Sequence, residues 1–511
     1  MSSIYGHTAP RSSRSTVTPS IFGCVQNLTM TTRKLGVTAI VSGVLTTASV
    51  ANGLSFAIPS SVPANASAQI DAAPVGLSFE FFAFPEYFEQ LSLTDGCLGV
   101  LADAYGTSPP IRIGGTTQDR ATYNASLSSA VSYTVASPDD APETLTFGDS
   151  FMDIAASYSG SVTIGFNRRL DNINNTIAAA KVATSTISNL YAIELGNEPN
   201  FFTSSDPIAD GKSWTAAADA VSQVAWQSSV ATALDKTAII QAGVFFGLGS
   251  YEVTNLVGEE EETDATQYVR SFCHHYYPYS ASTADLDGLM SHEEIVEGVT
   301  AFQSQVSAAH ELDKDFVMGE TNSATGGGGG ISPTFGAGLW ILDYAMQAVI
   351  LGIKQLYFHQ GTIGNCPYCW WDETVNAPFF GAYTAALALG GASQVAQLDS
   401  GDSRVAAYTI YDSSGAPSRV LLYNSEYYTS GTRSSVNITL SGLSSTTVSA
   451  KRLTGDAATT TVGAGAITIG GQTFANGTCA LQGTEETETT AVQSGQATFT
   501  VQESEALLIY L

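Results

Sequence analysis

Basic side chains are scarce in this sequence. The 511 residues include 19 Lys and Arg against 47 Asp and Glu, which gives a formal net charge of −28 at pH 7. A surface this acidic repels nucleic acids, anionic membranes and sulfated polysaccharides, so we expect no nucleic-acid partner and no stable membrane association. Hydrophobic residues make up 44% of the chain, which excludes a disordered protein and allows a large core.

Cysteine is also scarce, so the chain is no disulfide scaffold. Cys24 lies in an N-terminal segment that we predict is removed, and the odd number left implies at least one free thiol or an intermolecular bond. The motif Cys366-Pro-Tyr-Cys369 is similar to a redox active site, but it lies deep in a long chain and precedes two tryptophans. We interpret it as part of a structural disulfide, formed locally or with another cysteine. The remaining cysteines are Cys97, Cys273, Cys366, Cys369 and Cys479.

Motifs for metals and nucleotides are missing as well. His274 and His275 are adjacent, so they point to opposite faces of a strand, and His359 is distant in sequence. The glycine run at 326–330 lacks the following Lys-Ser/Thr of a phosphate-binding loop. We therefore expect neither a metal nor a cofactor.

A long apolar run occurs only near the N-terminus. Arg33 and Lys34 precede the apolar residues 35–50, and Ala51 or Gly53 could mark a cleavage site. We predict that residues 1–53 form an upstream extension and a secretory signal peptide; a membrane anchor is the alternative. The mature protein is then expected to be secreted and extracellular. Sequons predict glycosylation in surface loops at Asn65, Asn124, Asn174, Asn437 and Asn476.

The hydrophobic pattern predicts an α/β protein with two domains. Over residues 73–388, eight short β-branched or aromatic runs alternate with Ala-rich helical stretches, which is typical of a (β/α)8 TIM barrel. Residues 389–511 contain short strands at regular spacing, which predict a C-terminal antiparallel β-sandwich. Residues 54–72 include a strand with no following helix, and we expect it to join the sandwich. We favour a packing role for the sandwich over a carbohydrate-binding module.

Two carboxylates stand at the ends of the predicted fourth and seventh barrel strands, where TIM barrels carry their function. Glu198 lies in "ELGNEPN" and Glu320 in "MGETN", so the pair should face each other across the barrel mouth. Retaining glycosidases need one protonated and one ionised carboxyl group about 5–5.5 Å apart. The alternative is that both are ordinary residues at loop starts. The other predicted strand ends are Glu80, Thr116, Asn197, Tyr277 and Gln360.

Nearby residues suit this chemistry. Asn197 could donate a hydrogen bond to a sugar 2-hydroxyl group, and Tyr277 could bond to the nucleophile or to the sugar. Arg112 could hold the nucleophile ionised. Glu194 lies about one barrel layer deeper, where we expect it to be a buried structural partner, with Arg112 as the candidate.

Four motifs together resemble glycoside hydrolase family 79, which includes fungal and bacterial β-glucuronidases and the animal heparanases. They are "IRIGGTTQD" at 111–119, "ELGNEPN" at 194–200, "HHYY" at 274–277 and "GETNSATGGGGG" at 319–330. The resemblance covers the barrel in order and extends to the sandwich. It implies Glu198 as the acid/base and Glu320 as the nucleophile.

The resemblance also implies binding residues for the substrate. Glu80 and Thr116 would contact the terminal sugar, and Tyr277 matches a family tyrosine. The backbone amides of Gly326 and Gly327 would bind the uronic carboxylate, because glycine N–H groups can converge into an anion-binding nest. Tyr368 would match a further family tyrosine, although the "NCPYCWW" insertion departs from the pattern and puts that match in doubt.

Heparanases are basic, whereas this chain is acidic. The resemblance therefore favours a secreted retaining exo-β-glucuronidase that removes glucuronic acid, or its 4-O-methyl form, from glycans such as arabinogalactan side chains. Its partner would be a glucuronic-acid-bearing oligosaccharide or glycoprotein glycan. The alternatives are a retaining β-glycosidase for a neutral sugar and a non-catalytic glycan-binding barrel.

Overall fold

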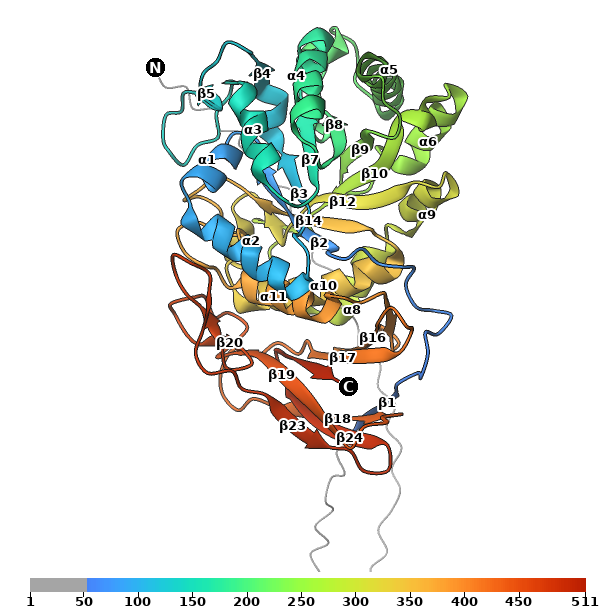
Figure 1. Ribbon diagram of the computed structural model, residues 1–511, viewed down its shortest axis with the longest axis vertical. Coiled ribbons are helices and arrows are strands. Elements are labelled where there is room, and N and C mark those ends of the chain that lie inside the picture. The colour runs from blue at the N-terminus through green and yellow to red at the C-terminus, as the bar shows by residue number, and fades with distance from the viewer. Residues whose placement is uncertain (1–52) are drawn as a thin grey trace, which may run out of the picture. The chain divides into compact units, whose positions relative to one another are not determined.

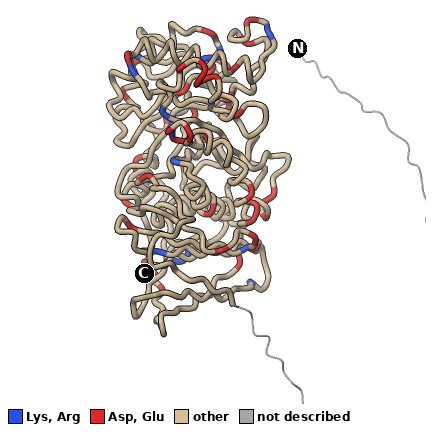
Figure 2. The backbone as a smooth tube through the Cα atoms, turned by 90° about the vertical axis from the view of Figure 1, so that its right-hand side faces the viewer, with Lys and Arg blue, Asp and Glu red and all other residues tan. Residues whose placement is uncertain are grey.

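The computed structural model describes residues 53–511, so the predicted upstream extension and signal peptide lie outside the described residues. Among the helices of this described part, none has both the length and the apolar character needed to cross a bilayer. Acidic positions outnumber basic ones throughout the backbone (Figure 2). The excess of negative charge is therefore spread over the fold and is not confined to one segment.

Eight parallel strands close into a barrel in the order β2-β3-β7-β8-β9-β10-β12-β14. Each strand coincides with one of the eight predicted runs, so the TIM-barrel prediction is confirmed. Four of the eight barrel strands, β2, β3, β7 and β14, are buried along their whole length, because side chains fill the interior and helices cover the outside. The strands are β2 (Val75–Glu80), β3 (Ile111–Gly114), β7 (Val162–Phe166), β8 (Leu190–Leu195), β9 (Ile240–Phe246), β10 (Val269–Tyr276), β12 (Asp315–Thr321) and β14 (Gln355–Gln360).

Helices surround the barrel, as Figure 1 shows. Ala-rich sequences form α4 and α5, whose N-termini are capped by the side chains of Asn172 and Thr215. The helices are α1 (Phe84–Glu89), α2 (Ser92–Tyr105), α3 (Asp149–Ser157), α4 (Ile173–Thr186), α5 (Ala216–Leu234), α6 (Val253–Glu262), α7 (Leu286–Met290), α8 (His292–Thr300), α9 (Gln303–Glu311), α10 (Phe335–Leu351) and α11 (Pro378–Leu389).

Short strands form within the loops at the ends of the barrel strands. An insertion between β3 and α3 forms a small sheet in the order β4-β6-β5. A second pair, β11 with β13, joins the loops that follow β10 and β12. These strands are β4 (Ala121–Tyr123), β5 (Val131–Tyr133), β6 (Leu145–Phe147), β11 (Tyr279–Ser280) and β13 (Ala324–Thr325).

The C-terminal part is a sandwich of two sheets, as predicted. One sheet has the order β1-β18-β24, and the other has the order β15-β16-β17-β25-β19-β20, with β23 beside β19. β1 (Leu54–Ala57) pairs in parallel with β18, so the orphan strand does join the sandwich. The other strands are β15 (Gln394–Gln397), β16 (Val405–Tyr411), β17 (Pro417–Asn424), β18 (Ser435–Ser441), β19 (Thr447–Gly455), β20 (Ile467–Ile469), β21 (Thr473–Phe474), β22 (Leu481–Gln482), β23 (Glu488–Ala491), β24 (Gln496–Gln502) and β25 (Glu505–Tyr510).

The larger sheet packs on the barrel through α10 and α11, which lie between the two domains in Figure 1. Alternate residues of its strands serve the two faces: Ala407 belongs to the sandwich core, whereas Tyr408 packs into the core shared with the barrel. This explains why α10 is apolar on nearly every side. The large buried interface supports the packing role that we predict for the sandwich.

Residues 53–511 contain two disulfides. Cys97 in α2 pairs with Cys479, and Cys366 pairs locally with Cys369, so the structural reading of the CPYC motif is confirmed. Of the cysteines in the described part of the chain, Cys273 is free and buried. It lies in the barrel interior with Val244, Val317 and Tyr357.

The five sequon asparagines that we expect in surface loops are all exposed, but two of them are not in loops. Asn174 lies in the first turn of α4, and Asn437 lies in β18 with its side chain accepting a hydrogen bond from Thr500. The sequon motif reports only local sequence, so it cannot distinguish an exposed helix or strand from a loop.

Candidate active site

Glu198 and Glu320 meet at the mouth of the barrel. Glu198 follows β8 and Glu320 lies near the end of β12. One carboxylate oxygen of each lies within 4.8 Å of the other. This separation fits direct attack on a sugar by one of the two groups, and it is too small for the 6.5–9.5 Å that a water between the carboxyl groups of an inverting enzyme requires.

Local backbone features place the two carboxylates. Glu198 adopts the left-handed conformation, with φ 48° and ψ 58°, and its N–H donates to the Val244 carbonyl at 3.0 Å. A non-glycine residue in this region is held there by its surroundings, and such residues concentrate at functional sites. Before Glu320, the strand pairing shifts by one residue at Gly319, where a Cβ would lie 2.3 Å from Cys273 Sγ. Only glycine fits at this point, and the shift in register aims Glu320 into the mouth.

Arg112 binds the carboxylate of Glu320 from inside the barrel. Its guanidinium lies 2.6 Å from Glu320 Oε2 and 2.8 Å from Glu194 Oε2, and Arg112 and Glu194 are fully buried. The expected pairing of Arg112 with Glu194 is therefore present. Tyr277 donates to Glu320 Oε1 at 2.9 Å. Burial opposes ionisation, but the charges of His359 and Arg112 and the tyrosine hydrogen bond outweigh it and lower the pKa of Glu320.

Glu198 has the opposite electrostatic environment. Burial and the negative charge of Glu320 raise its pKa well above 4.5. Its Oε1 lies 2.9 Å from His275 Nδ1, and burial lowers the pKa of His275 to about 4, so the imidazole is neutral above that pH. One carboxyl group thus tends to stay protonated while its neighbour is ionised. Such a divided pair supplies an acid and a nucleophile at the same pH.

Asn197 is held with its amide nitrogen available. Its Oδ1 accepts from Arg112 at 2.8 Å, and its backbone N–H donates to Asp119 Oδ2 at 2.6 Å. Because Arg112 occupies the oxygen, Nδ2 is the atom left to donate to a ligand. This agrees with the predicted contact to a sugar 2-hydroxyl group.

Glu80 lies at the end of β2 among polar neighbours. Thr117 donates to its Oε1 from both the backbone nitrogen, at 2.9 Å, and the hydroxyl group, at 2.5 Å. His359 Nε2 lies 3.3 Å from Glu80 Oε2, and the carboxylates of Glu320 and Glu80 raise the pKa of His359 against the effect of burial. Thr116, which the resemblance selects, begins the 3₁₀ helix Thr116–Arg120 with its side chain exposed.

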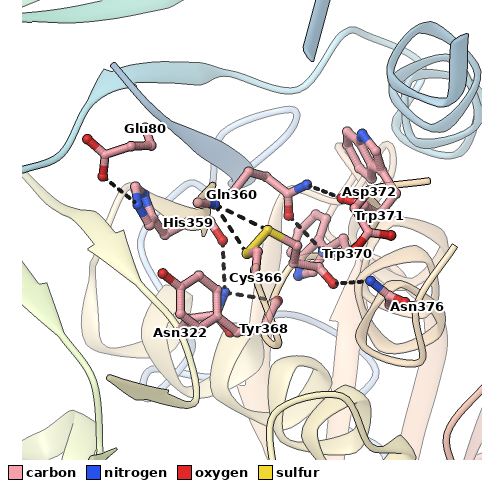
Figure 3. The surroundings of a disulfide bond; sticks show 12 residues. Glu80, Asn322, His359, Gln360, Cys366, Tyr368, Trp370, Trp371, Asp372 and Asn376 are labelled. Carbon is pink, nitrogen blue, oxygen red and sulfur yellow. Dashed lines mark hydrogen bonds and ion pairs between the residues drawn. A yellow bond between two sulfur atoms is a disulfide. The ribbon is translucent and has the colours of Figure 1, made fainter. Parts of the chain in front are cut away.

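Tyr368 enters the same region from the loop after β14. Its ring centre lies 6.3 Å from that of Tyr277 and 6.1 Å from that of His359. Figure 3 shows this tyrosine between the Cys366–Cys369 disulfide and Asn322, whose amide donates to the Tyr368 carbonyl at 3.3 Å. The local disulfide therefore shapes the segment that presents Tyr368.

The glycine run forms a left-handed loop beside this segment. All five glycines have positive φ, for example 65° at Gly326 and 90° at Gly327, which only glycine adopts without cost. Both N–H groups lack a hydrogen-bond acceptor within residues 53–511, and both residues are exposed. A Cβ on Gly328 would lie 3.1 Å from Pro367, so the loop contacts the chain next to Tyr368.

Reading strand ends alone missed several side chains of the site. Gln360 is a predicted strand end, but its amide bonds to the backbone of Trp370 and Trp371. The preceding residue, His359, faces the mouth instead. His275 was considered only as a metal ligand, although it contacts Glu198. Asp119 was also missed.

Two groups of described side chains have the spacing of metal ligands. One group is Glu194, Cys273 and His275, and the other is Glu198, His275 and Glu320. The Arg112 guanidinium already neutralises a carboxylate in each group. A divalent cation would have to compete with this fixed charge. The donor set therefore fits acid–base chemistry better than metal binding.

Comparisons with known proteins show which family this chain resembles. A sequence signature described as the glycosyl hydrolase family 79 C-terminal beta domain matches residues 407–508. A β-glucuronidase of Aspergillus niger is 29% identical over 406 residues, covering 70% of this chain and 72% of that protein. The crystal structure of a 4-O-α-L-rhamnosyl-β-D-glucuronidase from Fusarium oxysporum 12S, in complex with Rha-GlcA, is 57% identical with a TM-score of 0.88, and it covers 90% of this chain and 100% of that one.

Proposed function

The chain belongs to glycoside hydrolase family 79 and is a glycoside hydrolase, and from this premise we propose that it is a retaining exo-β-glucuronidase. The observation that carries the proposal is the pair of carboxyl groups within 4.8 Å whose pKa values are shifted in opposite directions. The glucuronidase names of the relatives support the choice of sugar.

The geometry supports a double displacement. Glu320 attacks the anomeric carbon while Glu198 gives its proton to the departing glycosidic oxygen, which leaves a glycosyl ester on Glu320. Glu198, now ionised, takes a proton from water, and the resulting hydroxide displaces Glu320 from the same carbon. Two inversions retain the β configuration, and Asn197 Nδ2 can bind the 2-hydroxyl group in both steps.

The uronic carboxylate is the feature that separates glucuronides from neutral glycosides. We assign its binding to the N–H groups of Gly326 and Gly327 and to the hydroxyl groups of Tyr277 and Tyr368. These are uncharged donors, so they bind an anion without adding a full positive charge near the catalytic pair. Tyr277 has one hydroxyl hydrogen, which Glu320 accepts in this structure, so it would donate to the sugar carboxylate only by turning to it when substrate binds. Glu80 and Thr116 are assigned to the sugar hydroxyl groups.

The natural substrate is proposed to be a glycan of the arabinogalactan type outside the cell. The predicted signal peptide supports secretion, and the five exposed sequons are accessible to glycosylation. The 57% identity to the Fusarium enzyme favours a glucuronic acid that carries a sugar at O4. A second candidate activity is therefore release of a 4-O-rhamnosyl-glucuronic acid disaccharide, as an alternative to release of glucuronic acid or its 4-O-methyl form.

A panel of 4-nitrophenyl glycosides tests the proposal. We expect the β-glucuronide to be cleaved with a kcat/KM well above those of the β-galactoside and β-xyloside. Glu320→Gln should abolish turnover of the glucuronide while sugar binding persists, because the amide keeps the shape of the carboxylate and cannot attack. Faster cleavage of the galactoside would establish a neutral-sugar glycosidase, and unchanged behaviour of Glu320→Gln would establish a non-catalytic binding barrel.

A further inference from the structure

A cavity of about 470 Å³ lies beside the active site and takes no part in the chemistry described above. One wall is the insertion between β3 and α3, and the other is the loop between β14 and α11. The Asn365 amide donates to the Asp139 carbonyl at 3.1 Å and joins the two walls. The residues that matter for its chemistry are Phe82, Tyr133, Val135, Pro138, Ile363 and Glu373.

Short connections link this cavity to the sugar-binding residues. Phe82, at its inner wall, comes two residues after Glu80 and donates its N–H to the Thr117 hydroxyl at 3.2 Å, and that hydroxyl bonds to Glu80. Thr362, which also lines the cavity, comes three residues after His359. The cavity therefore lies directly outside the Glu80–His359 pair.

The position of Glu198 sets the direction of a bound sugar. Glu198 follows β8, and β14 is four strands away in the closed barrel of eight, on the opposite side of the mouth. The glycosidic oxygen on C1 must face Glu198 to receive its proton. In a pyranose ring C4 lies opposite C1, so O4 points away from Glu198 and toward the cavity beyond Glu80 and His359.

The side chains that line the cavity indicate which kind of ligand it could bind. Phe82 and Tyr133 form a perpendicular aromatic pair with ring centres 5.3 Å apart, and aliphatic side chains of Val135 and Ile363 extend the apolar surface. Among the described residues that line the cavity, none is Lys or Arg, whereas Glu86, Asp139 and Glu373 are acidic. Aromatic faces suit the C–H side of a sugar, and carboxylates accept from its hydroxyl groups and repel a second uronate.

We propose that this cavity is the subsite for one neutral sugar residue joined to O4 of the glucuronic acid, with its apolar side against Phe82 and Tyr133. The inference rests on the proposed function and names the residues that would let the enzyme release a disaccharide. A deoxyhexose fits the apolar lining best, because a methyl group replaces a hydroxyl that would otherwise lose its hydrogen bonds to water.

The test compares two substrates that differ only at O4: 4-nitrophenyl β-D-glucuronide and its 4-O-α-L-rhamnosyl derivative. Tyr133→Ala and Ile363→Ala alter the cavity, and Tyr427→Ala is the matched control. Tyr427 lies on the C-terminal domain and has the same 36% exposure as Tyr133. For each cavity variant, kcat/KM on the rhamnosylated substrate should fall about tenfold more than on the plain glucuronide, as expected for lost apolar contacts. The control should leave the ratio unchanged.

The outcomes separate this inference from the proposed function. Wild-type cleavage of the plain glucuronide but not of the rhamnosylated one would overturn the subsite and leave the glucuronidase intact. An equal loss on both substrates in Tyr133→Ala and Ile363→Ala, or no loss on either, would also overturn it. Cleavage of neither glucuronide by the wild type would overturn both proposals. A selective loss on the rhamnosylated substrate in both variants would establish the subsite.

Discussion

Removal of one disulfide should mainly lower stability, and removal of the other should mainly weaken substrate binding. The perturbation is removal of each bond by a double substitution, Cys366→Ser with Cys369→Ser in one variant and Cys97→Ser with Cys479→Ser in the other. The first bond shapes the loop that carries Tyr368, and both of its sulfur atoms accept from the Gly361 N–H at 3.2 Å. The second bond joins α2 to the loop before β22, and neither of its cysteines is among the residues assigned to the site.

Sequence separation gives the expected effect on stability. In the chain-entropy account, a cross-link stabilises by restricting the unfolded chain, and the effect grows with the logarithm of the loop length. The separations are 3 residues for Cys366–Cys369 and 382 for Cys97–Cys479. The formula gives about 2 kcal/mol for the short loop and about 6 kcal/mol for the long one.

Substrate binding should suffer more from loss of the Cys366–Cys369 bond than from loss of the Cys97–Cys479 bond. Without the Cys366–Cys369 bond, Tyr368 keeps its backbone contact to Asn322 but loses the closed loop that orients it (Figure 3). Misplacing one hydrogen-bond donor to the uronic carboxylate should raise KM for 4-nitrophenyl β-glucuronide about tenfold, with a smaller change in kcat. The Cys97–Cys479 variant should keep the wild-type KM.

The assay combines urea unfolding with steady-state kinetics at 25 °C on both variants. Each variant gains two serine hydroxyl groups at buried positions, so comparing the two variants isolates the difference between the two bonds. A normal KM in the Cys366/Cys369 variant would refute the positioning argument. A larger loss of stability in that variant than in the Cys97/Cys479 variant would refute the loop-length reasoning.

Three further predictions concern pH and the glycine loop. Since Glu198 is the proposed acid and its pKa is raised well above the ordinary value of 4.5, kcat/KM should fall with rising pH only well above pH 4.5, and a fall centred near pH 4.5 would contradict the assignment. His292, between the carboxylates of Asp343 and Asp399 in the domain interface, has its pKa raised to about 10 by those charges against burial, so its stabilisation is complete below pH 6.5 and is lost as pH rises. Between pH 6.5 and 8.5 the free energy of unfolding should drop by about 2 kcal/mol relative to a His292→Gln variant, measured by urea titration, and parallel curves would exclude this role. Gly327→Val should lower kcat/KM for the glucuronide about tenfold, while Gly330→Val, at an equally open left-handed position, should lower it far less; equal kinetics in the two variants would return the run to the status of a linker.

Much of the fold is encoded locally and could be predicted. The β-branched runs and the Ala-rich stretches differ in period, so their alternation along the chain indicates strands and helices without knowledge of their partners. Glu198 and Glu320 follow the fourth and seventh of these runs, and the geometry of a closed barrel then brings them together. The same logic placed Arg112 beside Glu194.

Other features depend on register and could not be predicted from local pattern. His359 and Gln360 are adjacent, and only the barrel decides which faces the mouth and which faces the tryptophans of the following loop. The shift in strand pairing at Gly319 turns Glu320 inward, and the left-handed backbone of Glu198 is imposed by its contact with Val244.

The sequence by itself therefore determined the class of fold, the order of the strands and the pair of carboxylates that we propose to be catalytic, because these follow from periodicity and from the ends of successive strands. The tertiary structure alone decided the contact of His275 with Glu198, the pairing of Cys97 with Cys479, and the cavity between Tyr133 and Ile363. Each of these joins residues far apart in the chain, and their proximity is set by the packing of loops that carry no period of their own.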